Sequence, residues 1–129
     1  MDGRGLGAFV ERVSDGDTIE LVYSLEFGIV RRARARLIDV DTAETFGRAP
    51  GSTERVEGER QAAFVRDWVA AGVAPPRQAW PFVALVHGAD KYGRDLVDLV
   101  RVRDGRSLVA DLVAAFPSVA QGARLAGSG

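Results

Sequence analysis

Stretches rich in valine, isoleucine and leucine alternate with turn residues along the first forty or so positions. Two strands are predicted at about 8–13 and 18–24, joined by a turn from Ser14 to Asp17. Glu26 to Gly28 has the composition of a hairpin end, and a third strand is predicted from Ile29 to Val40. The first third of the chain is therefore expected to be β-structure.

The third predicted strand carries a run of arginines. In its centre Arg32, Arg34 and Arg36 fall on one face and small or apolar residues on the other, because successive side chains of a strand point to opposite faces. The run, which also includes Arg31, has two interpretations. It is either a track for phosphate groups, or Arg32 and Arg34 simply solvate an exposed face, and we favour the second for these two residues.

The second half of the chain mixes helical and strand patterns. The elements expected there are an exposed loop over 45–58, a helix over 59–71, strands over 82–87 and 96–102, and a short helix over 108–115. Gly72 is predicted to end the first helix and Ser107 to cap the second. Trp68 lies on the apolar side of the first helix and is expected in the core, whereas Trp80 stays undecided between the core and stacking on a base.

This order of elements predicts the fold. Three strands, a helix, two strands and a helix suit a small closed barrel, whereas a parallel βαβ arrangement would need more alternating helices. We expect an α+β, mainly β fold: a five-stranded OB-fold barrel with two to three packed helices. The 129 residues are enough for a single domain, 1–129, and too few for two.

Composition limits the chemistry. The chain has no cysteine, so a metal ion would be held by oxygen or by the single histidine, His87. His87 ends a predicted strand and is expected to be an exposed structural residue rather than a general acid. The net charge of −1 argues against bulk binding of nucleic acid, so any positive charge that binds phosphate must be local. Nearly all basic residues are arginine, which suits bidentate phosphate binding.

The location of the protein is also predicted from composition. No apolar run is long enough to span a membrane, and the first residues do not resemble a secretory signal. We therefore expect a cytoplasmic protein with no membrane partner. The arginine bias fits a bacterium with a GC-rich genome or its phage.

Three clusters of small charged residues fall where turns or strand ends are expected. They are Asp15-Gly16-Asp17-Thr18, Arg36 to Glu44, and Asp90-Lys91-Tyr92-Gly93-Arg94. Each alone indicates only a polar turn, because aspartate and glycine are common turn residues. In this order and spacing, over about residues 9–116, the clusters resemble those of the staphylococcal nuclease (thermonuclease-like) family.

The resemblance implies a role for each matching residue. Asp17 and Asp41 would bind one Ca²⁺ through their carboxylates and Thr42 through its backbone carbonyl, with Asp15 beside these ligands but not on the metal. Glu44 would act as general base or position the attacking water. Two arginines would hold the scissile phosphate, and two residues of the third cluster would contact a neighbouring phosphate. These pairs are Arg36 with Arg94, and Lys91 with Tyr92.

The resemblance therefore implies a calcium-dependent endonuclease, a hydrolase of phosphodiester bonds in DNA, RNA or both, with little sequence specificity. The alternative is a catalytically weak or silent domain of the same family that binds nucleic acid or another protein. The presence of all five residues that the family uses for catalysis favours the enzyme. These residues are Asp17, Arg36, Asp41, Glu44 and Arg94.

The sequence departs from the family pattern in three places. Ala43 stands where the family usually has proline, which would stiffen the turn before Glu44. The hairpin between Asp17 and Arg36 is longer than usual. The region after about residue 117 is short, with Ser118 to Leu125 as a remnant of the family's last helix. We expect less base-binding surface as a result, and a monomer or a homodimer that covers the exposed core.

Overall fold

The computed structural model describes residues 4–43 and 51–120. The elements are β1 (Arg4–Asp15), β2 (Thr18–Ser24), the 3₁₀ turn η1 (Glu26–Gly28), β3 (Val30–Leu37), α1 (Thr53–Val73), β4 (Phe82–Ala89), β5 (Asp95–Arg101), α2 (Leu108–Ala115) and the 3₁₀ turn η2 (Pro117–Val119). The five strands and two α-helices agree with the predicted order.

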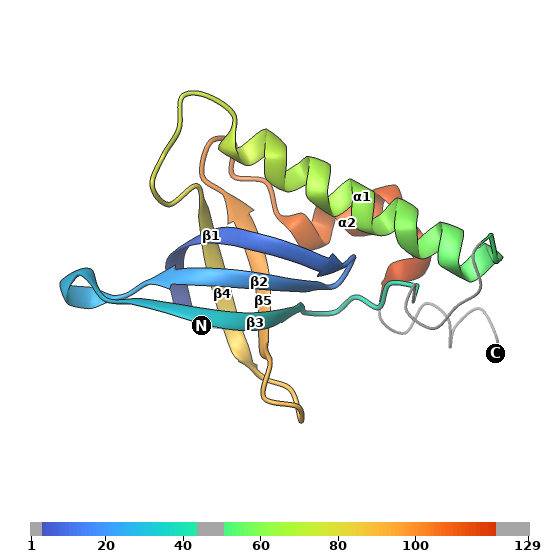
Figure 1. The fold of residues 1–129 in the computed structure, drawn as a ribbon, viewed down its shortest axis with the longest axis horizontal. Helices are drawn as coiled ribbons and strands as arrows, with labels where there is room; N and C mark the ends of the chain where they lie inside the picture. Colours follow the sequence, from blue (N-terminus) through green and yellow to red (C-terminus); the bar gives the residue numbers. More distant parts are fainter. Residues whose placement is uncertain (1–3, 44–50, 121–129) are drawn as a thin grey trace.

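The strands form one closed barrel in the order β1-β2-β3-β5-β4, with β4 pairing back onto β1. All neighbours are antiparallel except β3 and β5, which run parallel over Ala35–Leu37 and Asp95–Val97. In Figure 1 the helices lie along one side of the barrel, with α1 crossing above β1. The expectation of a mainly β, OB-like barrel is confirmed.

The barrel is filled by the alternating apolar residues of its strands. Ile19, Leu21, Ala35 and Leu37 are fully buried, so the alanine and leucine face of β3 points inward and its arginines point outward, as predicted. Trp68 of α1 is also buried and stacks on Phe82 of β4, with ring centroids 5.6 Å apart. That contact attaches α1 to the barrel.

Helix α1 is longer than the sequence predicted at both ends. It begins at Thr53, so the expected loop over 45–58 is wrong from residue 53 onward. Ser52 caps the helix, because its hydroxyl accepts the N–H of Arg55 at 3.2 Å. Arg55 also forms an ion pair with Glu59, one turn later in the helix. Polar residues that suggested a loop are therefore the exposed side and cap of a helix.

Gly72 does not end α1 as predicted. It lies inside the helix and is buried, and a Cβ there would stand 2.6 Å from Cε1 of Phe82. Gly72 allows α1 to pack closely against β4. The helix ends at Val73, because Ala74 precedes Pro75 and a residue before proline disfavours the helical conformation.

Strand β3 ends at Leu37 rather than at the predicted Val40. Asp39 has a φ of 63°, which turns the chain out of the strand direction. Val40 then forms an isolated bridge with Ala120, just after η2. The remnant helix predicted over 118–125 is thus a 3₁₀ turn as far as Val119, and residues 121–125 lie outside the described ranges.

Neither α1 nor α2, the two α-helices in the described ranges, has an apolar stretch long enough to cross a lipid bilayer.

The β2–β3 hairpin projects away from the helices in Figure 1, while the β1–β2 turn and the end of β3 lie together at the opposite side. The described candidate residues of the first two clusters, up to Ala43, are therefore brought to one end of the barrel.

Candidate active site

The β1–β2 turn places Asp17 beside the end of β3. Thr18 pairs in register with Arg36, and the N–H of Leu37 donates to the carbonyl of Asp17 at 2.8 Å. Oδ2 of Asp17 accepts the backbone N–H of Thr42 at 3.1 Å. Asp17 is thus fixed between β3 and the segment that follows it.

Gly16 is required for this close approach. A Cβ at Gly16 would stand 2.8 Å from Cγ2 of Thr42, a distance that side chains do not tolerate. The Asp-Gly-Asp sequence is therefore more than a turn preference, because the glycine allows the turn to pack against Thr42.

Arg36 joins the two carboxylates, of Asp17 and Asp41, that the family resemblance implied as metal ligands. Its Nη2 lies 2.6 Å from Oδ1 of Asp41 and 3.5 Å from Oδ2 of Asp17. The side chain of Arg36 is only 17% exposed, so its charge is poorly screened by water. The structure brings these three residues together as the sequence predicted.

The segment after β3 is held by partners from distant parts of the chain. The N–H of Asp41 donates to the carbonyl of Val119 at 2.7 Å, and the N–H of Ala43 donates to Oε1 of Gln61 at 2.8 Å. Gln61 is 1% exposed and lies in α1. An alanine at position 43 therefore keeps an N–H that proline would lack, and this hydrogen bond holds the turn.

Sequence analysis assigned no role to Gln61. It stands four residues before Val65 and seven before Trp68, on the buried stripe of α1. A polar side chain at that helical spacing is the signal that could have identified it, because buried polar groups are nearly always hydrogen-bonded.

The third cluster forms a compact loop between β4 and β5. Oδ1 of Asp90 accepts the N–H groups of Tyr92 and Arg94, both at 2.9 Å, and Oδ2 accepts Nε of Arg94 at 2.8 Å. Desolvation acts to raise the pKa of Asp90, but these hydrogen bonds and the charge of Arg94 together hold it below the ordinary value. Asp90 is thus an ionised anchor that orients Arg94.

Asp95, the first residue after this loop, connects the loop to the barrel through Tyr23. The hydroxyl of Tyr23 donates to Oδ2 of Asp95 at 2.8 Å, and the side chain of Tyr23 is buried. Burial, followed by the hydrogen bond to Asp95, raises the pKa of the Tyr23 phenol above its ordinary value. The hydroxyl therefore remains a donor at neutral pH.

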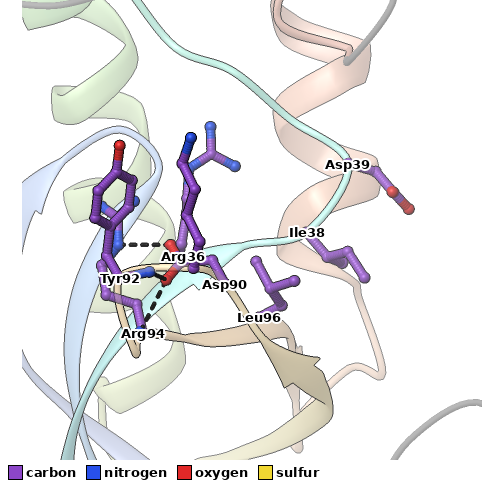
Figure 2. A pocket seen from close by; sticks show the side chains of 8 residues that line it. Arg36, Ile38, Asp39, Asp90, Tyr92, Arg94 and Leu96 are labelled. Atoms are coloured by element: carbon purple, nitrogen blue, oxygen red, sulfur yellow. Dashed lines mark hydrogen bonds and ion pairs between the residues drawn. The ribbon is translucent and has the colours of Figure 1, made fainter.

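Two hollows meet at Arg36 and Arg94. One, of about 210 Å³, is lined by Asp15, Asp17, Thr18, Arg36, Asp41, Thr42, Ala43 and Arg94. The other, of about 290 Å³, is lined by Arg36, Ile38, Asp39, Asp90, Lys91, Tyr92, Arg94 and Leu96. Figure 2 shows the second, with Asp90 bonded to Arg94 and the carboxylate of Asp39 pointing away from Tyr92. Every predicted site residue in the described ranges therefore lines one of two adjoining hollows.

The first hollow offers the donor chemistry that Ca²⁺ prefers. The carboxylates of Asp17 and Asp41 line it together with Thr42, and all their donor atoms are oxygens. Within the described residues, no three histidine, aspartate or glutamate side chains converge on one point. A calcium ion would therefore take part of its coordination shell from water and from substrate oxygens.

Three residues weighed in the sequence analysis remain, and the two that the structure describes, His87 and Trp80, line neither hollow. Glu44 lies outside the described residues. His87 is exposed near the end of β4 and lines neither hollow, which agrees with a structural residue. Trp80 packs against β1, stacked on Phe9 with ring centroids 5.8 Å apart. Trp80 is half-buried and precedes β4, so it covers the outside of the barrel and is not among the core residues.

No family model matches the chain, and no curated protein matches it at a significant level. The resemblance to the staphylococcal nuclease family therefore depends on the motifs of this chain and stays a prediction.

Proposed function

We propose that this protein is a calcium-dependent nuclease that hydrolyses phosphodiester bonds of DNA, RNA or both with little sequence specificity. The observation that carries the proposal is the meeting of Asp17 and Asp41 with Arg36 and Arg94 around one hollow. Oxygen donors for a hard cation and guanidinium groups for an anion are thus placed side by side. Action in the cytoplasm, as a monomer or a homodimer, belongs to the same proposal.

The two arginines fit a phosphodiester. A guanidinium is planar and always charged, so it can hold two phosphate oxygens at once. Among the described residues, Asp90 contacts the guanidinium of Arg94 only at Nε. The terminal nitrogens of Arg94 therefore remain available to the substrate. As the attacked phosphate gains negative charge, Arg36 and Arg94 would stabilise it.

Asp17, Asp41 and the carbonyl of Thr42 would hold the calcium ion. When bound, the ion would polarise a phosphoryl oxygen and help to orient water. Glu44 follows Ala43 directly in the sequence, and the N–H of Ala43 donates to Oε1 of Gln61. Glu44 would accept the proton of the attacking water.

Cleavage of single-stranded DNA, with calcium or with a chelator, tests the proposal. Wild type and Glu44→Gln are compared with Glu26→Gln, which removes a glutamate at the distant β2–β3 hairpin. We expect cleavage only with calcium, a loss of about 10²–10⁴-fold in Glu44→Gln because the general base is removed, and little change in Glu26→Gln. Binding without cleavage in calcium and in chelator would instead support the silent binding domain.

A further inference from the structure

Arg34 differs from the other arginines of β3. Arg31 pairs with Asp95 at 3.5 Å, Arg32 with Glu11 at 3.0 Å, and Arg36 with Asp41 at 2.6 Å. Among the described residues, Arg34 has no ion pair or side-chain hydrogen bond, although its side chain is exposed on the same face as Arg32 and Arg36. A charge without a protein partner on an otherwise neutralised strand is free to bind an anion.

The residue across from Arg34 does not neutralise it. Glu20 of β2 is its register partner, but the carboxylate of Glu20 makes its ion pair with Arg12, at 3.9 Å. Arg12 lies on the far side of β2 from β3, because β2 pairs with β1 on one edge and with β3 on the other. The carboxylate of the residue opposite Arg34 is therefore engaged by another arginine.

Arg34 faces the candidate active site. It lines a hollow of about 400 Å³ with Tyr92, Gly93 and Arg94, and Arg94 also lines both hollows of the site. Arg34 and Arg36 are two residues apart on one strand face, so their Cα atoms are separated by about 7 Å. That spacing is close to one nucleotide of an extended single strand.

The lining of this hollow combines two positive charges with an exposed aromatic ring. This lining has two guanidinium groups and no carboxylate, whereas the metal-binding hollow proposed above is lined by Asp15, Asp17 and Asp41. Tyr92 is 72% exposed, and Arg94 lies over its ring with Cζ 5.6 Å from the centroid. An exposed aromatic ring beside a phosphate-binding arginine is a common arrangement for a base attached to its phosphate.

We propose that Arg34, expected from sequence only to solvate its strand face, forms a second phosphate subsite for the nucleotide next to the scissile bond. The ring of Tyr92, which the resemblance assigned to a neighbouring phosphate, would lie beside the attached base. This inference depends on the proposed function. It makes the substrate class a flexible, single-stranded polynucleotide of several nucleotides, held at successive phosphates by Arg94 with Arg36 and then by Arg34. A dinucleotide has one phosphodiester and cannot occupy both positions.

Binding of a fluorescent single-stranded oligonucleotide of about ten nucleotides, in chelator and at several salt concentrations, tests the subsite. Arg34→Gln is compared with Arg32→Gln, which removes the same charge from the same strand face but from a residue paired with Glu11. We expect Arg34→Gln to weaken binding about fivefold and to reduce the salt slope by about 0.7, the value for one phosphate contact on a single strand. Arg34→Lys should keep most of the slope, because the charge remains.

Cleavage in calcium provides the second measurement. The ratio of KM between Arg34→Gln and wild type should be larger for the oligonucleotide than for a dinucleotide, since only the oligonucleotide reaches Arg34. Equal effects of Arg34→Gln and Arg32→Gln on binding, with normal cleavage by the wild type, would overturn the subsite and leave the proposed function intact. Absence of both cleavage and binding in the wild type would overturn both.

Discussion

Of the three segments that carry the candidate site, the one after β3 and the loop between β4 and β5 are held in opposite ways. The N–H groups of Asp41, Thr42 and Ala43 bond to Val119, Asp17 and Gln61, respectively, which lie in η2, the β1–β2 turn and α1. The loop from Asp90 to Arg94 is closed almost entirely by its own first residue. The first segment therefore takes its shape from the complete fold, and the second largely from local hydrogen bonds.

This difference predicts how each segment fails. A change that removes the acceptor for the N–H of Thr42 or Ala43, both buried residues, should lower both stability and activity. A change inside the Asp90–Arg94 loop should disorient Arg94 but leave the barrel core intact, because no residue of the loop is buried in that core. Measuring stability and cleavage in the same variants separates the two cases.

The largest effect is expected at Asp17. Asp17→Ala removes a proposed calcium ligand and the acceptor for the N–H of Thr42, so cleavage should fall by at least about 100-fold and unfolding free energy by about 1–3 kcal/mol. Asp17→Asn is the matched control, because it keeps an oxygen acceptor and loses only the charge. Its cleavage should fall similarly while its urea midpoint stays nearer to that of the wild type. Equal loss of stability in both variants would show that the hydrogen bond from the N–H of Thr42 does not account for the lost unfolding free energy.

A smaller effect is expected at Gln61. Gln61→Leu leaves the N–H of Ala43 buried without an acceptor, which should cost about 1–3 kcal/mol of unfolding free energy and about tenfold in cleavage, since Glu44 follows. Urea unfolding and initial rates measure the two effects.

Proline at position 43 supplies the control for Gln61. In an Ala43→Pro background there is no N–H to satisfy, so Gln61→Leu should cost about 1 kcal/mol less than it does in the wild type. Additive losses in this double-mutant cycle would contradict the assigned role of Gln61.

The same contrast explains what could be predicted from sequence. Apolar runs between turn residues, with alternation in β3, predicted the five strands, and Ser107 correctly marked the start of α2, because these signals depend on neighbouring residues. The Asp90 loop was likewise visible as a motif. The start of α1 was not predicted, because Ser52 could be recognised as a cap only once Thr53 to Gly58 were known to be helical.

The distant partners were beyond local patterns for a different physical reason. The bond between Ala43 and Gln61 spans 18 positions, and its existence depends on how α1 packs against the barrel. The sequence identified Ala43 as a departure from the family, but nothing near it in the chain indicated which group would hold its N–H. The pairing of Arg32 and the lack of a partner for Arg34, in the described ranges, also became apparent only in three dimensions.

The smallest effect is expected in the Asp90 loop. Asp90→Ala removes the acceptor for the backbone N–H groups of Tyr92 and Arg94 and for Nε of Arg94. Cleavage should therefore fall about five- to tenfold while the urea midpoint changes little. Asp104→Ala is the control, because Asp104 binds Arg101 and the N–H of Arg106 in a similar turn away from the site. Cleavage by Asp104→Ala should match the wild type. A fall in the midpoint of Asp90→Ala as large as that of Gln61→Leu would remove the proposed distinction between the segments.

Acid sharpens the same comparison without a substitution. The pKa of Asp90 in the folded protein is below its ordinary value, so ionised Asp90 stabilises the loop above the unfolded pKa of about 3.9. That contribution is lost only as the pH falls through the lower, folded value. The amide resonances of Tyr92 and Arg94 should therefore keep their neutral-pH positions down to about pH 4 and shift below it, provided that the barrel is still folded. Movement of both resonances together near pH 5 or 6 would mean that Asp90 is not the ionised anchor of the loop.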